Sequence, residues 1–244
     1  MGCAGASASE PVFDAKILSS PQQTTELWPS PQPLWQAAPE AVAAGLCSDA
    51  SRGGPALSGP WRLLLLGDGS PTRHLQSLTG QPVQVEVIAM QADQQVAREA
   101  PQEVEELEPP LLRRQVWLRC GPLTLAWAES WWNQQQAERH LQARNQPIWT
   151  SLTANRAELY REVDGLARVQ APWLEDGFGM AGPYWSRHYR FFRGGRELTV
   201  IREVFSPLLE RWLGRGNAAA GAASAAGCQR QRRSGRAEGR NARS

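Results

Sequence analysis

The sequence predicts an α+β fold built on a single antiparallel sheet flanked by helices. Two hairpin signals indicate antiparallel strands: apolar segments at 116–120 and 123–128 meet at a Gly-Pro turn, and segments 184–192 and 197–205 flank an Arg-Gly-Gly-Arg turn. The helical signals stand apart from these hairpins and do not alternate with strands, which argues against βαβ units and a parallel sheet. The length of 244 residues is ample for one buried core.

Three elements are expected before the first hairpin. Ser70 and Pro71 have the residue types of an N-cap and a first helical position, and Gly80 can end the short helix that they begin. Residues 81–89 alternate apolar with polar side chains, which predicts a strand. Residues 91–114 are acidic and interrupted by proline. We expect a long loop there, either a lid that closes over a site or a plain surface loop.

Two more helices are expected later in the chain. Pro147 opens a segment whose apolar residues fall near helical spacing, and Gly165 is its stop signal. Ser206 and Pro207 cap a last short helix that Gly214 closes.

Composition divides the chain into three parts. Residues 1–58 are rich in Pro, Ala and Gln and are expected to form a poorly ordered extension, with Trp28 and Trp35 as residues that dock on the body. Residues 59–213 form the single folded domain. Residues 214–244 are almost entirely Arg, Ala, Gly, Ser and Gln, which predicts a disordered tail.

The net charge of +2 hides a basic tail on an acidic body. Residues 214–244 carry seven arginines against one glutamate, so the rest of the chain is net negative. Such a tail can attract RNA or acidic partners through counterion release. It holds no aromatic residue that would stack on a base, so we expect no nucleic-acid partner and a solvated tail.

Several function classes are not expected. The longest aliphatic run is Leu63–Leu66, and the N-terminus lacks the layout of a signal peptide, so we expect a cytoplasmic protein without a membrane span. The four cysteines and three histidines are scattered, without a CxxC motif or a neighbouring His pair. We therefore expect neither a metal site nor a disulfide framework.

Glu203 and Arg119 are charges inside strand patterns. Glu203 shares its strand face with Ile201 and Phe205, and Arg119 shares its face with Trp117. Charges among apolar residues must be paired with each other or must face a ligand cavity. A buried Arg–Glu pair, or two surface residues on a half-exposed sheet, would produce the same pattern.

Two helix starts add a second signal, at Ser70-Pro71-Thr72 and at Pro147-Ile148. Free amides at a helix N-terminus bind anions, although most such starts are ordinary caps. Beside an interior arginine, they indicate a carboxylate site.

Five motifs follow one another along the chain: Gly67-Asp68-Gly69-Ser70-Pro71-Thr72-Arg73, Val116-Trp117-Leu118-Arg119, Gln146-Pro147-Ile148-Trp149, Trp185-Ser186-Arg187 and Leu198-Thr199-Val200-Ile201-Arg202-Glu203-Val204-Phe205-Ser206-Pro207. Taken together and in this order, they resemble chorismate lyase (chorismate–pyruvate lyase), in particular its cyanobacterial and algal branch. The resemblance covers about residues 60–213, and no single motif is diagnostic.

The resemblance implies an antiparallel sheet with a buried site, no cofactor, and conversion of chorismate to 4-hydroxybenzoate and pyruvate for plastoquinone or ubiquinone biosynthesis. It implies that Arg119 holds the ring carboxylate, that the backbone amide of Ile148 helps it, and that Glu203 meets the ring hydroxyl as the acid/base group. One amide contact of the family falls on Pro71, which has no N–H to donate. The amides of Thr72 or Arg73 are the candidates to replace it.

An alternative of the same fold stays open, a non-catalytic domain that senses a small aromatic or sugar acid. Such domains in bacterial transcription regulators follow an N-terminal winged helix, and residues 1–58 are too polar and proline-broken to form one. We therefore expect an enzyme, acting as a monomer on chorismate. This interpretation requires Arg119 and Glu203 to face one cavity, and it fails if they lie on opposite sides of the sheet or in solvent.

Overall fold

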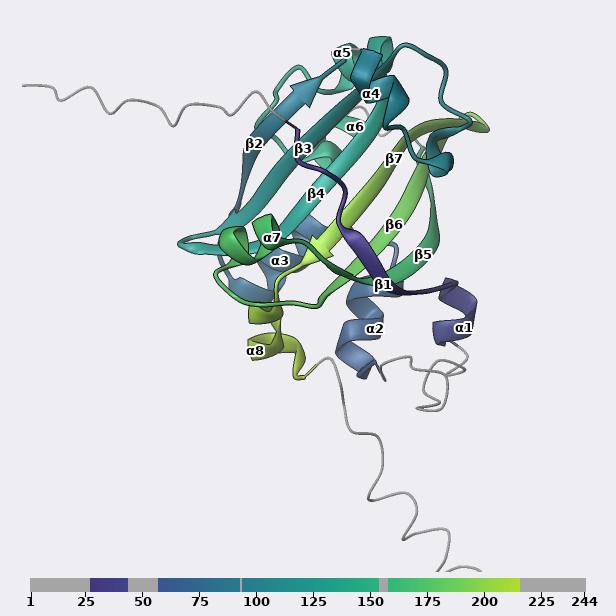
Figure 1. Ribbon diagram of the computed structural model, residues 1–244. Coiled ribbons are helices and arrows are strands. Elements are labelled where there is room, and N and C mark those ends of the chain that lie inside the picture. Colours follow the sequence, from purple (N-terminus) through teal and green to yellow (C-terminus); the bar gives the residue numbers. More distant parts are fainter. Residues whose placement is uncertain (1–26, 44–56, 93, 154–157, 216–244) are drawn as a thin grey trace, which may run out of the picture.

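The computed structural model describes residues 27–43, 57–92, 94–153 and 158–215. Their core is a seven-stranded antiparallel sheet in the order β1-β5-β6-β7-β4-β3-β2 (Figure 1). The strands are β1 (Gln32–Ala37), β2 (Val83–Gln91), β3 (Leu111–Cys120), β4 (Leu123–Asn133), β5 (Tyr160–Gln170), β6 (Tyr184–Arg193) and β7 (Arg196–Phe205). The predicted α+β class with one antiparallel sheet is confirmed.

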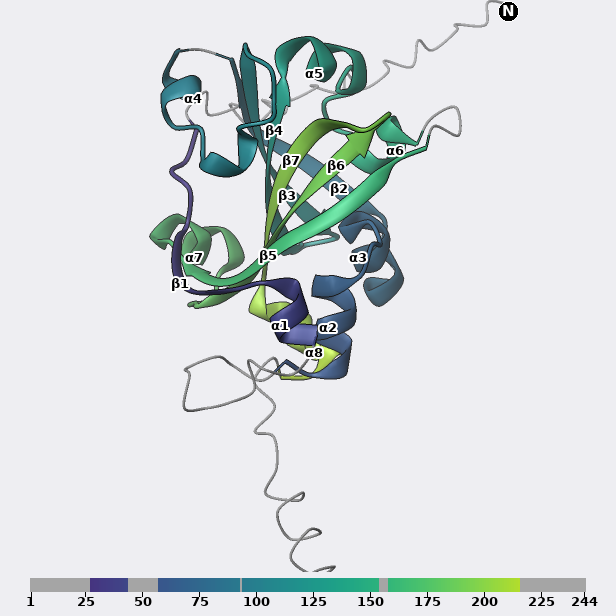
Figure 2. The same ribbon diagram turned by 90° about the vertical axis from the view of Figure 1, so that its right-hand side faces the viewer.

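Helices cover both faces of this sheet. They are α1 (Pro39–Ala43), α2 (Gly59–Leu66), α3 (Pro71–Thr79), α4 (Gln94–Arg98), α5 (Gln134–His140), α6 (Ile148–Leu152), α7 (Pro172–Phe178) and α8 (Glu210–Leu213), with 3-10 turns η3 (Gln102–Val104) and η5 (Pro207–Leu209). Figure 2 shows the strands between α4 and α7 on one side and α3 and α6 on the other. None of the helices in the described residues is long and apolar enough to cross a membrane.

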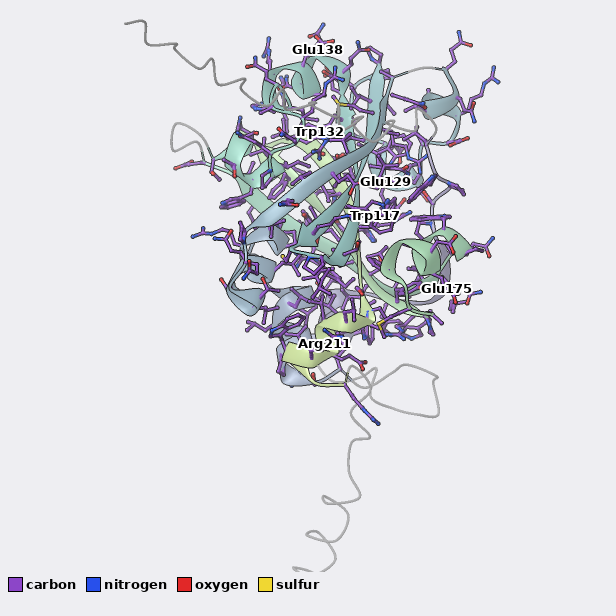
Figure 3. All side chains as sticks on the ribbon, turned by 90° about the vertical axis from the view of Figure 1, so that its left-hand side faces the viewer. Trp117, Glu129, Trp132, Glu138, Glu175 and Arg211 are labelled. Carbon is purple, nitrogen blue, oxygen red and sulfur yellow. The ribbon has the colours of Figure 1, made fainter. Side chains whose placement is uncertain are left out.

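Consecutive residues of each strand point to opposite faces of the sheet, and each face has its own hydrophobic core. Trp117 packs with residues of α7, and we call this side the α7 face; Trp117 and Glu129 point to it (Figure 3). Val116 and Leu118 point the other way and pack with residues of α2 and α3, and we call this side the α3 face. A third cluster, around Trp132 and Ile201, occupies the other end of the α3 face, under α5 and α6.

Part of the N-terminal extension belongs to the folded domain. β1 pairs with β5, and Trp28 packs its ring on Trp117 and Trp173 with centroid distances of 5.5 and 4.8 Å. The Gln115 side chain accepts from the Trp28 amide and donates to its carbonyl, both at 2.8 Å. This corrects the domain start at residue 59. Residues 1–26, 44–56 and 216–244 lie outside the described residues.

The sequence predicted the helices and strands correctly where capping or turn residues mark their ends. Pro71 begins α3 and Gly80 ends it with a left-handed backbone at φ 67°. The two predicted hairpins are present as β3–β4 and β6–β7. Gly194 and Gly195 supply the positive φ angles of the second turn. Ser206 caps the last helical turns through a hydrogen bond from the Leu208 amide.

The expected helix from Pro147 to Gly165 is wrong. Among the residues of this segment that the structure describes, only Ile148–Leu152 is helical, and β5 begins at Tyr160. Gly165 lies in the middle of β5, where the register with β6 shifts, and a Cβ there would meet the His188 ring at 2.3 Å. Gly165 is therefore required by close packing and not by a helix end.

The segment 91–114 is neither a lid nor a plain loop. It contains α4 and η3, and its last residues begin β3. Val96 and Val104 are buried against Trp131 and Val200, on the sheet face that α7 also covers. The segment is therefore part of the core on that side.

Candidate functional site

A pocket lies on the α3 face between the two cores of that face. Strands β2 to β7 form its floor and the starts of α3 and α6 form its rim. It is lined by Ser70, Pro71, Thr72, Val85, Arg114, Val116, Leu118, Ala128, Ser130, Pro147, Ile148, Trp149, Arg161, Tyr189, Phe191, Ile201 and Glu203.

Glu203 is the acidic side chain of the pocket. It is 1% exposed and both its oxygens have partners: Oε2 accepts from Arg187 Nε at 2.8 Å, and Oε1 accepts from the Tyr189 hydroxyl at 2.6 Å. Burial and the neighbouring carboxylate raise the pKa of Tyr189, so its phenol stays protonated and donates. A carboxylate has about four acceptor positions, so Glu203 keeps capacity to accept from a ligand hydroxyl.

Arg187 fixes Glu203 to the end of a helix. Its Nη1 donates to the carbonyls of Leu64, Leu65 and Gly67 at 2.8, 3.3 and 3.1 Å, at the C-terminus of α2. These are the carbonyls that a helix end leaves unpaired, and a cation there also interacts favourably with the helix dipole. The buried Arg–Glu pair considered as an alternative exists, but its arginine is Arg187.

Arg114 is the arginine of β3 that faces the pocket. It is 2% exposed, and its Nη2 donates to the Arg144 carbonyl at 2.6 Å, in the segment that leads to α6. Among the described residues, Arg114 has no ion-pair partner and its Nε has no hydrogen-bond partner. Burial lowers the pKa of Arg114 to about 10, which keeps it charged at neutral pH. An uncompensated buried cation at a pocket wall is suited to bind an anion.

The remaining expected residues divide between the pocket and the surface. Ile148 lies at the start of α6, and Pro71 and Thr72 lie at the start of α3; all three line the pocket. Arg119 does not line it. Its side chain is 40% exposed and pairs with Glu86 at 2.7 Å.

The position of Arg119 corrects the expectation that it faces the site. Arg119 pairs across the strands with Gln84, one residue away from the Val85–Leu118 pair that lines the pocket. Because side chains alternate along a strand, Arg119 points to the opposite face from Leu118. The guanidinium that shares the pocket with Glu203 on this wall is that of Arg114.

Sequence reasoning missed four polar residues of the pocket: Arg114, Ser130, Arg161 and Tyr189. Ser130 lies opposite Arg114 on β4, and its buried hydroxyl has no partner among the described residues. Extending the alternation of Val116 and Leu118 back along β3 would have indicated Arg114. The expected helix at 147–165 concealed Arg161, which is on β5.

Trp131, Trp132 and His188 have structural positions. Trp131 and Trp132 are buried on opposite faces of the sheet and belong to the core. His188 lies over Gly165, away from the Glu203 pocket, and burial lowers its pKa. Neither the tryptophan pair nor His188 lines the pocket.

The fold and the pocket define a class: a single-sheet α+β protein with a largely apolar pocket whose charged groups suit a small acid. Solved structures with a similar arrangement include the effector domain of PhnF from Mycobacterium smegmatis, at 13% identity and a TM-score of 0.43, covering 58% of this chain and 91% of that one. The C-terminal domain of the histidine utilization repressor from Pseudomonas syringae has 14% identity and a TM-score of 0.39, covering 55% and 97%.

Sequence comparison identifies relatives and a family. Proteins described as "Uncharacterized protein ycf21" are 31% identical in Porphyra purpurea, covering 62% of this chain and 83% of the relative, and 28% identical in Cyanophora paradoxa, covering 62% and 78%. Residues 65–213 match the family described as "Chorismate pyruvate-lyase Rv2949c-like". The chain belongs to this family.

Proposed function

We propose that the protein is a chorismate lyase that eliminates pyruvate from chorismate and releases 4-hydroxybenzoate, a precursor for quinone biosynthesis. The observation that carries the proposal is a buried arginine without an acidic partner, Arg114, facing the same pocket as Glu203. Family membership of residues 65–213 supports it. The proposal includes a cytoplasmic monomer that needs no redox cofactor, because the reaction leaves the overall oxidation state unchanged.

The ring carboxylate of chorismate is placed on Arg114. A guanidinium fork matches a carboxylate in two parallel hydrogen bonds. Ser130 lies beside Arg114, and its unpartnered hydroxyl is available as a further donor. The Ile148 amide, at the start of α6, is the backbone donor that completes this set.

Glu203 then faces the hydroxyl-bearing ring carbon. In the elimination, the C–H bond of that carbon breaks and its proton passes to Glu203. The C–H electrons form the last ring double bond, the C–O bond to the enolpyruvyl group breaks, and enolpyruvate takes up a proton to become pyruvate. Aromatisation drives this step, so the protein supplies orientation and one acid/base group. Arg187 and Tyr189 hold that carboxylate in place.

The direct test is an assay of the purified protein with chorismate that follows 4-hydroxybenzoate and pyruvate. Arg114→Ala is expected to lower kcat/KM at least about 100-fold, since it removes a bidentate charged contact in a buried site. Arg119→Ala is the matched control. It removes an arginine of the same strand that is exposed and paired with Glu86, and it is expected to leave kcat/KM within about twofold.

Two outcomes would contradict the proposal. Equal losses in the two arginine variants would mean that Arg114 has no special role in the site. Calorimetric binding of chorismate by the wild type without any product would favour the sensing function.

A further inference from the structure

Arg161 is a second buried arginine of the pocket and is held rigidly. It is 9% exposed, and its Nη1 donates to the Asp68 and Gly69 carbonyls at 2.9 and 2.6 Å. Its guanidinium carbon lies 4.4 Å from the ring centroid of Tyr189 and 4.6 Å from that of Phe191. The carbonyls and rings orient the guanidinium, but they carry no net negative charge.

The charge of Arg161 has no counterion in the described part of the chain. No carboxylate there lies within ion-pair distance of Arg161, and its buried Nε has no hydrogen-bond partner. Burial of a cation without a counterion is costly, and aromatic rings offset only part of that cost. As for Arg114, a ligand anion would supply what is missing.

The two arginines stand on different walls of one pocket. Arg114 is on β3 and Arg161 is on β5, with β4, β7 and β6 between them, and Glu203 lies on the intervening β7. Glu203 is already neutralised by Arg187. Among the described residues, the ionisable side chains that line the pocket therefore leave two uncompensated positive charges, which match a ligand with two carboxylates and a neutral part between them.

We propose that Arg161 binds the second carboxylate of the substrate, the one on the enolpyruvyl group. This rests on the proposed function, in which Arg114 holds the ring carboxylate. When the C–O bond breaks, the second carboxylate leaves with pyruvate, and 4-hydroxybenzoate keeps only the contact with Arg114. Arg161 thereby distinguishes substrate from aromatic product and weakens retention of the product.

The experiment compares Arg161→Gln with wild type for two ligands. The KM and kcat for chorismate are measured in the lyase assay, and the Kd for 4-hydroxybenzoate is measured by calorimetry. We expect kcat/KM for chorismate to fall about 10- to 100-fold, as for loss of a charge-assisted hydrogen bond. The Kd for 4-hydroxybenzoate is expected to stay within about threefold of wild type, a change below about 0.7 kcal/mol.

Two further variants make the result specific. Arg161→Lys keeps the charge without the fork, so its loss for chorismate is expected to be intermediate; it also replaces Arg161→Gln if that variant does not fold. Arg168→Gln is the matched control, because Arg168 lies on the same strand over the Trp185 ring at 4.7 Å, donates to the Pro183 carbonyl and does not line the pocket. It is expected to leave both ligands unaffected.

Equal losses for chorismate and 4-hydroxybenzoate in Arg161→Gln, or no loss for either, would overturn the inference while leaving lyase activity of the wild type in place. If the wild type forms no product, the proposed function fails by itself. In that case the role of Arg161 is decided by comparing wild type with Arg161→Gln in their Kd values for chorismate and for 4-hydroxybenzoate. If wild type does not bind chorismate, the inference about Arg161 is overturned.

Discussion

Adjacent arginines in β3 have opposite environments. Arg113 points to the α7 face, where Glu129 and Glu99 both pair with it. Arg114 points to the α3 face, where its partner within the described ranges is a backbone carbonyl alone. Both are almost fully buried, so burial does not distinguish them. The missing acidic partner does, because a folded protein pairs its buried charges unless a ligand is to do so.

At this scale we expect Glu203→Gln to remove most turnover. The amide keeps the shape of the side chain and an acceptor for Arg187 or Tyr189, but it takes up no proton. Turnover of chorismate should fall at least about 100-fold, within the range of general acid–base catalysis. The Kd for 4-hydroxybenzoate should change little. Retained turnover, in a variant whose Tm shows that it is folded, would remove Glu203 from the acid/base role.

The sequence predicted that an arginine and a glutamate share the site, but it assigned the arginine to the wrong position. Glu203, Ile148, Pro71 and Thr72 lie in the pocket. Arg119 does not, because it shares the α7 face with Trp117, whereas the pocket lies on the α3 face. A short motif does not indicate which face of the sheet holds the ligand.

At the scale of elements, local chemistry predicted the hairpins and short helices, and long-range packing decided the rest. Residues 147–165 have apolar residues at a spacing that helices and strands share, and pairing with β6 made the second half of this segment a strand. The helix α7 shows the same dependence, because Gly177 packs directly on Trp117 of β3. Tertiary contact therefore determines both elements.

Gly177→Ala is expected to destabilise the protein by about 1–3 kcal/mol, as overpacking typically does. A Cβ at this position would lie 2.2 Å from Trp117 Cζ2. The Trp117 ring is confined by Trp28, Trp173 and Phe178, so it has no room to move. The loss should exceed the gain in helix propensity, about 1 kcal/mol.

The free energy of unfolding in urea measures this change. Gly59→Ala, in the first turn of α2 with no atom within 4 Å of the added Cβ, is the control and should stay within about 0.5 kcal/mol of wild type. Equal stability of Gly177→Ala and Gly59→Ala would show that α7 shifts freely on the sheet.

At the scale of the whole molecule, the sheet is completed by a segment from the far end of the sequence. β1 covers the edge of β5, and Trp28 covers Trp117 and Trp173. Trp28 was expected to dock on the body, but composition could not predict the strand, because residues 27–43 resemble their surroundings in Pro and Gln content and depend on partners that are distant in sequence. Arg113 also donates to the Trp28 carbonyl at 2.9 Å.

A chain that begins at residue 39 is therefore expected to be less stable than one that begins at residue 27. It loses β1 and two packed tryptophans, Trp28 and Trp35, which costs at least about 3 kcal/mol or roughly 6–12 °C in Tm. It also exposes the edge of β5 to pairing between molecules. Calorimetry and light scattering measure both effects. Equal Tm values for the two chains would mean that residues 27–38 contribute nothing to the folded state.

The location of the pocket between two cores of the same sheet face has a consequence for how this protein can change. A larger apolar side chain at a position such as Ala128 would join those cores and strengthen the fold, yet it would occupy the space reserved for the ligand. Selection for robustness and selection for activity therefore act in opposite directions on the same few positions.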